Sequence, residues 1–254
     1  MTKYFAFCQG DILLTKEGAI PQGESPSFPL KPWNEVTRLT MEDVTCVVVR
    51  LDTPVLSNGF QMIGLRATFD ILPASDYQLA GKCAELLYFD QNSKFCGCCG
   101  APMKWNSEIS KKCTNCGKEL WPPLAIAVIV RVLRKRADGQ DEILLVRANN
   151  FRGTHYGLVA GFVETGDTLE ESVERELWEE THIKVRNIQY FGSQPWPFPC
   201  GLMVGFTAEY AEGEIQIQRS ELNAAGWFTA DNLPNIPGKA SIARQLIDNW
   251  LRHN

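Results

Sequence analysis

The sequence predicts an α/β protein in three parts: an N-terminal α+β domain (residues 1–92), a four-cysteine zinc ribbon (93–121) and a C-terminal domain (122–254). Three observations lead to this prediction. Two C-x-x-C pairs stand near the middle of the chain, a Pro-Pro pair follows them, and apolar strand-like runs then alternate with a few long helical patterns. Such alternation is typical of an α/β domain.

Composition excludes several functional classes. The 254 residues include 44% hydrophobic and 22% charged side chains, as in an ordinary globular protein. A net charge of −5 argues against a protein that holds long nucleic acids by bulk electrostatics. No apolar run reaches the ~18 residues of a membrane span, and the N-terminus lacks the apolar segment of a signal peptide. We therefore expect a cytoplasmic protein without a membrane partner.

The N-terminal part contains one clear strand and one clear helix. Residues 45–51 form a β-branched apolar run that predicts a strand, and residues 75–89 predict a helix that leads into the ribbon. The stretch 21–32 is rich in Pro, Gly and Ser, so we expect a loop there. No motif in this part indicates chemistry.

The two C-x-x-C pairs have the layout of a tetrahedral zinc site, with Cys96 and Cys99 in one pair and Cys113 and Cys116 in the other. Cys98 lies inside the first pair, and the spacing excludes it. Disulfides are the competing interpretation. The other cysteines show no paired pattern, and without a secretion signal a reduced, zinc-binding protein is the better account: Cys8, Cys46, Cys83, Cys200.

We expect the zinc ion to be structural. Four thiolates close its coordination sphere and leave no position for a catalytic water. Five lysines and two glutamates give the ribbon a formal excess of three positive charges: Lys94, Lys104, Lys111, Lys112, Lys118, Glu108, Glu119. A zinc–thiolate centre with a formal charge of about −2 cancels most of this excess. Contact with RNA is the alternative role for the ribbon.

The C-terminal domain begins with a continuous apolar run at 124–132, which predicts a strand buried on both faces. Asp138-Gly139 forms a turn into its partner strand at 142–147. Further strands are expected near 185–191, 202–210 and 227–228. A final helix that starts at Ser241 is expected to complete the domain.

Three carboxylates on one predicted helix indicate a metal site. Glu176, Glu179 and Glu180 stand at i, i+3 and i+4, so they occupy about a third of the helix circumference. No Lys or Arg falls on the same arc, and a hard divalent cation with oxygen ligands would relieve their repulsion. A solvated acidic face is the alternative interpretation. The glycine-rich entry loop favours the metal site, because a solvated face needs no such loop.

The start of this helix is predicted at Asp167 as N-cap, with Glu170 three residues later as in a capping box. Arg175, four residues before Glu179, is expected to orient that carboxylate. An apolar stripe beside the acidic arc is expected to pack on the core: Leu169, Val173, Leu177.

The segment 161–183 resembles the Nudix box, whose pattern is G-x5-E-x7-R-E-U-x-E-E-x-G-U with U aliphatic. Seven positions match: Gly161, Arg175, Glu176, Leu177, Glu179, Glu180, Ile183. Asp167 replaces Glu, and His182 replaces Gly at a helix end where a left-handed conformation is expected. The resemblance implies a Nudix α/β/α sandwich with a mixed sheet, and a catalytic Mg²⁺ or Mn²⁺ ion.

A second motif, Ser-Gln-Pro-Trp-Pro-Phe-Pro at 193–199, holds aromatic rings on a stiff and irregular segment. By itself it would be interpreted as a loop that packs against the core. It resembles the array S-Q-P-W-P-F-P-x-S of the NADH pyrophosphatase branch of Nudix hydrolases, although Gly201 replaces the final Ser. Zinc ribbon, box and array occur in the order and spacing of that branch.

The resemblance implies a catalytic set of the three box glutamates with Arg175. The same glutamates would hold Mg²⁺ or Mn²⁺ together with Glu221, which matches a further family acid. The sequence does not single out one glutamate as the general base. Glu164 either contacts the metal-binding residues without contacting the metal itself, or is an exposed loop residue.

The substrate-binding residues implied by the resemblance are Phe162, Trp121, Ala243 and, from the array, Gln194. Phe162 matches the residue that stacks on the nicotinamide. Trp121 matches an aromatic that crosses a dimer interface to the other ring face, and the backbone of Ala243 matches a contact to the carboxamide. Otherwise Phe162 would be a strand-end core residue and Trp121 a cover for the ribbon. The histidines are expected to be surface or packing residues: His155, His182, His253.

The implied function is metal-dependent cleavage of the pyrophosphate bond of NAD(H), which yields nicotinamide mononucleotide and AMP. The same cleavage at an RNA 5′ end that carries NAD would remove that cap. A second hypothesis is a broader hydrolase of ADP-ribose or dinucleoside polyphosphates, which Gly201 and His182 favour. A third is a catalytically idle nucleotide sensor, against which the complete set of acids argues. A homodimer is expected from the resemblance alone.

Overall fold

The computed structural model describes residues 1–41, 43–57, 59–149 and 153–252. The chain forms two compact units. The first contains Met1–Leu124 with Pro197–Cys200, and the second contains Ala125–Trp196 with Gly201–Asn254. In the described part of the chain, no helix is both long and apolar enough to cross a membrane. The predicted division into three domains is finer than this and stays a prediction.

The first unit contains a five-stranded mixed sheet in the order β3-β4-β1-β2-β5, in which only β1 and β4 are parallel. Its strands are β1 (Thr2–Cys8), β2 (Asp11–Thr15), β3 (Glu35–Met41), β4 (Val44–Arg50) and β5 (Phe60–Gly64). A 3-10 helix (Leu65–Asp70) leads to helix α1 (Ala74–Asn92). The strand and helix predicted at 45–51 and 75–89 are confirmed.

The ribbon adds a small sheet in the order β6-β7-β8, formed by β6 (Met103–Trp105), β7 (Lys111–Cys113) and β8 (Glu119–Leu120). A buried ion cluster joins it to the end of α1. Lys111, only 2% exposed, lies 2.8 Å from Asp90, which also pairs with Arg50 and Lys94. Burial raises the pKa of Asp90, but hydrogen bonds from Lys111, Lys94 and Arg50 outweigh it, and the net pKa is lowered.

The second unit contains a six-stranded sheet in the order β12-β13-β9-β10-β14, and β11 pairs with β9 beside β10. Its strands are β9 (Ala125–Lys135), β10 (Asp141–Ala148), β11 (Val159–Phe162), β12 (Lys184–Trp196), β13 (Gly201–Glu212) and β14 (Leu222–Phe228). Strands β13 and β9 are parallel and the other pairs antiparallel, so the sheet is mixed.

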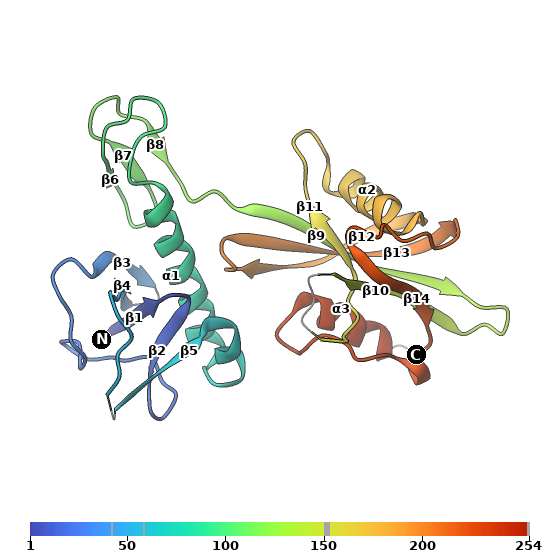
Figure 1. Cartoon of the computed structure of the whole chain (residues 1–254), viewed down its shortest axis with the longest axis horizontal. Coiled ribbons are helices and arrows are strands. Elements are labelled where there is room, and N and C mark those ends of the chain that lie inside the picture. Colours follow the sequence, from blue (N-terminus) through green and yellow to red (C-terminus); the bar gives the residue numbers. More distant parts are fainter. Residues whose placement is uncertain (42, 58, 150–152, 253–254) are drawn as a thin grey trace. The chain divides into compact units, whose positions relative to one another are not determined.

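Helices α2 (Leu169–Thr181) and α3 (Ile242–Leu251) cover opposite faces of this sheet (Figure 1). Alternate residues of β9 separate the two cores. Val128 and Val130 belong to the cluster that contains Leu177 of α2, and Ile129 belongs to the cluster that contains Leu246 of α3. The predicted α/β fold with an α/β/α sandwich is therefore confirmed.

Two local predictions were wrong. Ser193–Trp196 continue β12 instead of forming an irregular segment, and a turn follows only from residue 197. Pro195 is tolerated because β12 is an edge strand, where a missing N–H need not face a neighbour. The start of β9 is exposed rather than buried on both faces, since Ala125 and Ile126 lie outside the two cores.

Candidate active site

The acidic helix begins one residue later than predicted. Thr168 is the N-cap of α2: its hydroxyl accepts the N–H of Glu171 at 3.2 Å, and its own N–H donates to the Glu171 carboxylate at 2.8 Å. Asp167 as N-cap and Glu170 as its partner were therefore the wrong pair. The motif Thr-x-x-Glu at 168–171 was the usable sequence signal.

Asp167 holds Arg175 instead. Its carboxylate accepts hydrogen bonds from Nε of Arg175 at 3.0 Å and from the hydroxyl of Ser172 at 3.2 Å. A shorter acid at this position thus still reaches the guanidinium. The result is a fixed link between the entry loop of α2 and the second turn of the helix.

Arg175 connects the loop, the acids and the adjacent strand. Its Nη1 lies 2.8 Å from Glu176 and 3.2 Å from Glu179, and its Nη2 donates to the carbonyl of Phe162 at 2.8 Å. Burial lowers the pKa of Arg175, but the hydrogen bonds to Asp167 and Glu176 outweigh it, and the net pKa is raised.

The prediction that no cation relieves the acidic arc was therefore wrong. The long guanidinium side chain of Arg175 reaches around the helix, which the angular position of its Cα does not reveal. Glu164 stands at the margin of this cluster, 4.0 Å from Arg175 and largely exposed.

Glu176 occupies the space above a glycine of β11. A Cβ atom on Gly161 would lie 1.9 Å from the Glu176 carboxyl carbon and 2.1 Å from each of its oxygens. Only glycine therefore permits this position of the carboxylate. Burial raises the pKa of Glu176, and the hydrogen bond from Arg175 only partly offsets it. This tight contact explains why the box begins with Gly161.

Glu180 is the most unusual acid of the site. It is 6% exposed, and its carboxylate has no hydrogen-bond donor or cation among the described residues. Burial, followed by the charges of Glu176, Glu221 and Glu179, raises its pKa to about 8. It lines a cavity of about 380 Å³ with Glu221, Asn149 and residues of β10 and β11.

These acids have the chemistry of a cation site. Glu176 and Glu180 are buried carboxylates with raised pKa values, and Glu221 lines the same cavity as Glu180. A divalent ion that replaces the protons of Glu176 and Glu180 would stabilise this group of acids. Their oxygens do not converge as closely as the thiols of the ribbon. Among the described His, Cys, Asp and Glu side chains, only the four ribbon cysteines form a group of three or more that could hold a metal ion, and their ligand atoms lie within 4.8 Å of one another. The ligand set of the acids stays a prediction.

The predicted ring platform lies on the other face of the sheet. Register places Phe162, Ala127, Met203 and Gln194 side by side across four strands, so their side chains share one face. Met203 packs into the cluster of α3, which identifies this face. The row spans three strand spacings of about 4.8 Å, or roughly 14 Å. Phe162 is 66% exposed at one end of it.

Gln194, at the other end of the row, clamps the start of α3. Its amide nitrogen donates to the carbonyl of Ala240 at 2.8 Å, and its oxygen accepts the N–H of Ile242 at 2.6 Å. Ser241 caps the same turn by accepting the N–H of Arg244 at 3.3 Å. Within the described structure, the N–H of Ala243 has no acceptor. A backbone donor is thus held on the same face as Phe162.

The remaining predicted residues lie apart from this cluster. Trp121 belongs to the first unit and is 57% exposed. His182 ends α2 in the predicted left-handed conformation, with φ of 57°, and its ring contacts that of Trp178 in a tilted arrangement. His155 is half-buried, whereas His253 lies outside the described residues.

Comparison with known proteins establishes the family. The NUDIX domain family matches residues 123–250, half of the chain, and these residues include the acids, Phe162 and the array. The chain belongs to the Nudix hydrolase family. The predicted family is therefore confirmed.

Similar proteins cover nearly the whole of this Nudix hydrolase. The NAD-capped RNA hydrolase NudC of Deinococcus radiodurans is 38% identical over 98% of the chain and 87% of the relative. The protein of the same name from Klebsiella pneumoniae strain 342 is 38% identical over 91% of the chain and 86% of the relative. A NUDIX hydrolase structure from Nitrosomonas europaea covers 63% of the chain and 92% of its own, at 19% identity and a TM-score of 0.51, and so shows the fold alone.

In the ribbon of this Nudix hydrolase, the four predicted cysteines form one cluster. The Sγ atoms of Cys96 and Cys116 lie 3.6 Å apart, and those of Cys99 and Cys113 lie 3.4 Å apart. Four thiolates around a tetrahedral zinc at about 2.3 Å would lie about 3.8 Å apart, so the residues fit a zinc ion. Cys98 stays outside the cluster and contacts the Lys118 ammonium at 3.2 Å.

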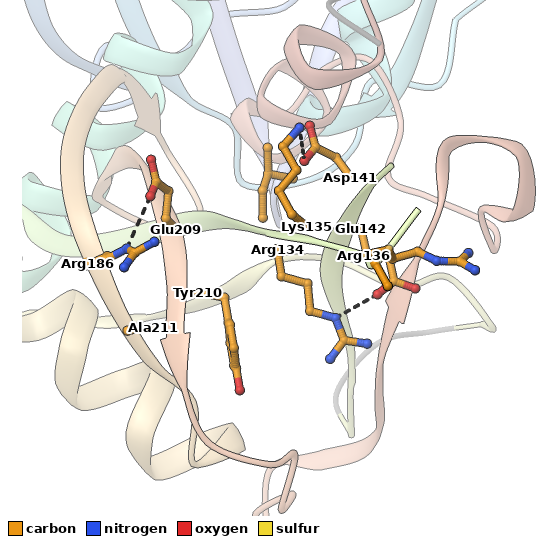
Figure 2. Close-up of a pocket in the computed structure, with 11 residues that line it drawn as sticks. Arg134, Lys135, Arg136, Asp141, Glu142, Arg186, Glu209, Tyr210 and Ala211 are labelled. Carbon is orange, nitrogen blue, oxygen red and sulfur yellow. Dashed lines mark hydrogen bonds and ion pairs between the residues drawn. The ribbon is translucent and has the colours of Figure 1, made fainter. Parts of the chain in front are cut away.

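Figure 2 shows a larger depression of about 1020 Å³ in the second unit, which we do not assign as the active site. Most of its charged side chains form ion pairs with one another, and Arg136 pairs with Asp138 beside it at 3.3 Å. Arg134 pairs with Glu142 at 2.7 Å, and the other pairs are Lys135–Asp141 at 2.8 Å and Arg186–Glu209 at 3.3 Å. None of the predicted site residues lines it.

Proposed function

We propose that this protein is a metal-dependent NAD(H) diphosphatase that also removes NAD caps from RNA 5′ ends. The products from NAD(H) are nicotinamide mononucleotide and AMP. One observation carries the proposal: β11 brings the acids and the ring platform together. Glu176 rests on Gly161, and the next residue, Phe162, presents an exposed ring on the opposite face. The full-length similarity to NAD-capped RNA hydrolases supports the same substrate class.

In this proposal the three box glutamates and Glu221 hold Mg²⁺ or Mn²⁺. The bound ion supplies charge neutralisation of the pyrophosphate and a water of lowered pKa. Arg175 keeps Glu176 and Glu179 oriented toward the ion, as its 2.8 and 3.2 Å contacts suggest. One box glutamate accepts a proton from the attacking water as the P–O–P bond breaks. Catalysis of this kind depends mainly on positioning and electrostatic stabilisation.

Recognition of the nicotinamide end falls to the other face of the sheet. Phe162 stacks on the ring, and the N–H of Ala243 donates to the carboxamide oxygen. Gln194 supports this contact through its two hydrogen bonds to the start of α3. Trp121 is proposed to cover the second ring face across a homodimer interface. Zinc in the four-cysteine cluster is proposed to be structural, and a reduced cluster fits a cytoplasmic location.

A broader Nudix hydrolase of ADP-ribose or dinucleoside polyphosphates is the second candidate. Gly201 favours it, because the array of the NADH-cleaving branch has Ser at this position. A Cβ there would lie 3.2 Å from the carbonyl oxygen of Trp196 and 3.3 Å from that of Ala125, so a larger residue would be crowded. An idle sensor is disfavoured, since it would not need two buried acids with raised pKa values.

The deciding experiment is product analysis by chromatography. The pure protein is incubated with Mg²⁺ or Mn²⁺ and, in parallel, with NADH, NAD⁺, ADP-ribose and an NAD-capped RNA. We expect release of the mononucleotide and AMP from NADH, removal of the cap from the RNA, and slow cleavage of ADP-ribose. Faster cleavage of ADP-ribose than of NADH would establish the second candidate instead. Absence of any cleavage would support a sensor.

A further inference from the structure

The outer face of the ribbon sheet carries two lysines in an unfavourable arrangement. Lys104 of β6 and Lys112 of β7 are directly opposite in the antiparallel register, and both are exposed. Their sequence neighbours Met103, Lys111 and Cys113 point to the buried inner face. Like charges directly opposite each other destabilise a strand pair. This arrangement therefore calls for an explanation other than folding.

No acid among the described residues forms an ion pair with these two lysines. Neither ammonium has an ion-pair partner within the described part of the chain. Glu119 is the cross-strand neighbour of Lys112, but its carboxylate accepts from Asn106 at 2.7 Å and from the Ser110 hydroxyl at 2.8 Å. The other ribbon acid, Glu108, accepts the N–H of Thr40 at 2.9 Å.

The ribbon lysines thus divide into two groups. Lys94 and Lys111 bind Asp90, and Lys118 contacts Cys98, so these three serve internal contacts. Lys104 and Lys112 have no ion-pair partner in the described ranges, so their ammonium groups can bind an external anion. The sum of charges over the ribbon, which suggests near neutrality once zinc is bound, conceals this segregation onto one face.

An exposed aromatic ring belongs to the same face. Phe95 is 67% exposed and forms an antiparallel bridge with Pro102, two residues before Lys104. Its neighbour Cys96 lies in the inner cluster with Met103 and Cys113, so the Phe95 side chain points outward with the two lysines. Phe95, Lys104 and Lys112 together form what we call the ribbon face.

We propose that the ribbon face binds the single-stranded RNA chain that follows the NAD cap. The proposal rests on the proposed function and extends it to the part of the substrate that a free dinucleotide lacks. A ring for base stacking beside free ammonium groups for phosphates is the combination found in binders of single-stranded nucleic acid. The backbone phosphates of the RNA would also provide the anionic partners that the opposed lysines do not have within the described part of the protein.

The test measures RNA binding directly, without turnover. Fluorescence anisotropy follows a labelled, uncapped single-stranded RNA of about twelve nucleotides, within the usual range of site sizes, over a range of salt concentrations. The variants are Lys104→Gln/Lys112→Gln and Phe95→Leu. The matched control, Lys16→Gln/Lys135→Gln, removes two exposed lysines elsewhere. Zinc content and the melting temperature verify that each variant is folded.

We expect the Lys104→Gln/Lys112→Gln variant to bind the RNA at least about tenfold more weakly than the control. The slope of log affinity against log salt should shrink by about 1.4, or about 0.7 for each lost phosphate contact. Phe95→Leu should weaken binding severalfold and leave the slope unchanged. The KM for NAD-capped RNA should rise in parallel, whereas kcat/KM for free NADH should stay within about twofold.

Equal RNA binding by the test and control variants, or absence of binding by the unaltered protein, would overturn the proposal. The two proposals can fail separately. If the unaltered protein does not cleave NADH but the Lys104→Gln/Lys112→Gln variant loses RNA binding, the ribbon face is retained and the diphosphatase is rejected. If the unaltered protein cleaves NADH but the variant binds RNA as the control does, the diphosphatase is retained and the ribbon face is rejected.

Discussion

Gly161 shows how one missing side chain determines the position of an acid that we propose to be catalytic. We predict that Gly161→Ala lowers kcat about a hundredfold or more, because its Cβ would occupy the place of the Glu176 carboxylate, 1.9 Å from its carbon. Steady-state kinetics with NADH will measure the loss. Gly139→Ala, at a turn glycine where a Cβ meets nothing within 4 Å, is the control for general strain. Unchanged kcat in Gly161→Ala would contradict this position of Glu176.

We predict that the buried carboxyl of Glu180 makes the stability of the metal-free protein depend on pH. Its pKa in the folded state is about 8, above the ordinary 4.5. Between these values the folded protein holds a proton that the unfolded chain has released. The free energy of unfolding should therefore fall as pH rises from about 4.5 to about 8, by at most ~1.4 kcal/mol per pH unit.

Urea unfolding at several pH values, with EDTA present, checks this prediction. Glu180→Gln cannot ionise, so it should flatten the slope over the same window. Saturating Mg²⁺ should also flatten it, because the ion replaces the proton. A stability that rises with pH in the metal-free protein would show that Glu180 is not buried as an unpaired acid.

A buried ion pair between the ribbon and the end of α1 contributes to the free energy of unfolding at the level of secondary-structure elements. Lys111 brings a charge from β7 into a buried site against Asp90 at the end of α1. We predict that Lys111→Met lowers the free energy of unfolding by about 1–3 kcal/mol, since Arg50 and Lys94 still neutralise Asp90. Urea denaturation will measure it. Lys112→Met, one residue away and exposed, should have little effect.

The clamp of Gln194 on α3 leads to a prediction about specificity. Gln194→Ala releases the carbonyl of Ala240 and the N–H of Ile242, so the first turn of α3 should loosen beside Ala243. We expect the KM for NADH to rise about tenfold, the equivalent of ~1.4 kcal/mol, as for the loss of a buried hydrogen-bond pair. ADP-ribose, which has no carboxamide, should be cleaved as before. An equal loss on both substrates would indicate general damage to the fold.

The four-cysteine cluster matters for the stability of the whole chain. The ribbon contains three short strands and a small cluster of buried residues, too little to remain folded alone. We predict that removal of zinc by a chelator lowers the melting temperature by at least several degrees, because metal binding and folding are coupled. Calorimetry before and after chelation, with zinc restored as control, will test this. An unchanged melting temperature would exclude a structural role.

Much of this protein could be predicted where the relevant geometry is local. The spacing of the C-x-x-C pairs selects four cysteines and excludes Cys98, as the cluster confirms. The apolar stripe of the acidic helix and the left-handed end at His182 were also predicted correctly. The stripe follows from the period of one helix, which the order of residues determines by itself, whereas the left-handed end follows from the resemblance to the box, which has Gly at this position.

Other features were decided only by tertiary structure. Which acid is unpaired, what Gln194 contacts and where Arg175 reaches all depend on strands and helices far apart in the chain. Sequence spacing places Glu179 and Glu180 on one arc of the helix. The packing around the helix leaves Glu179 exposed and buries Glu180, which raises the pKa of Glu180. The sequence alone thus determined the three long helices, most strands of the second unit, the cysteine set and the family. The pairing of β11 with β9 and the packing of α2 and α3 decided the site, because charge and contact depend on neighbours in space.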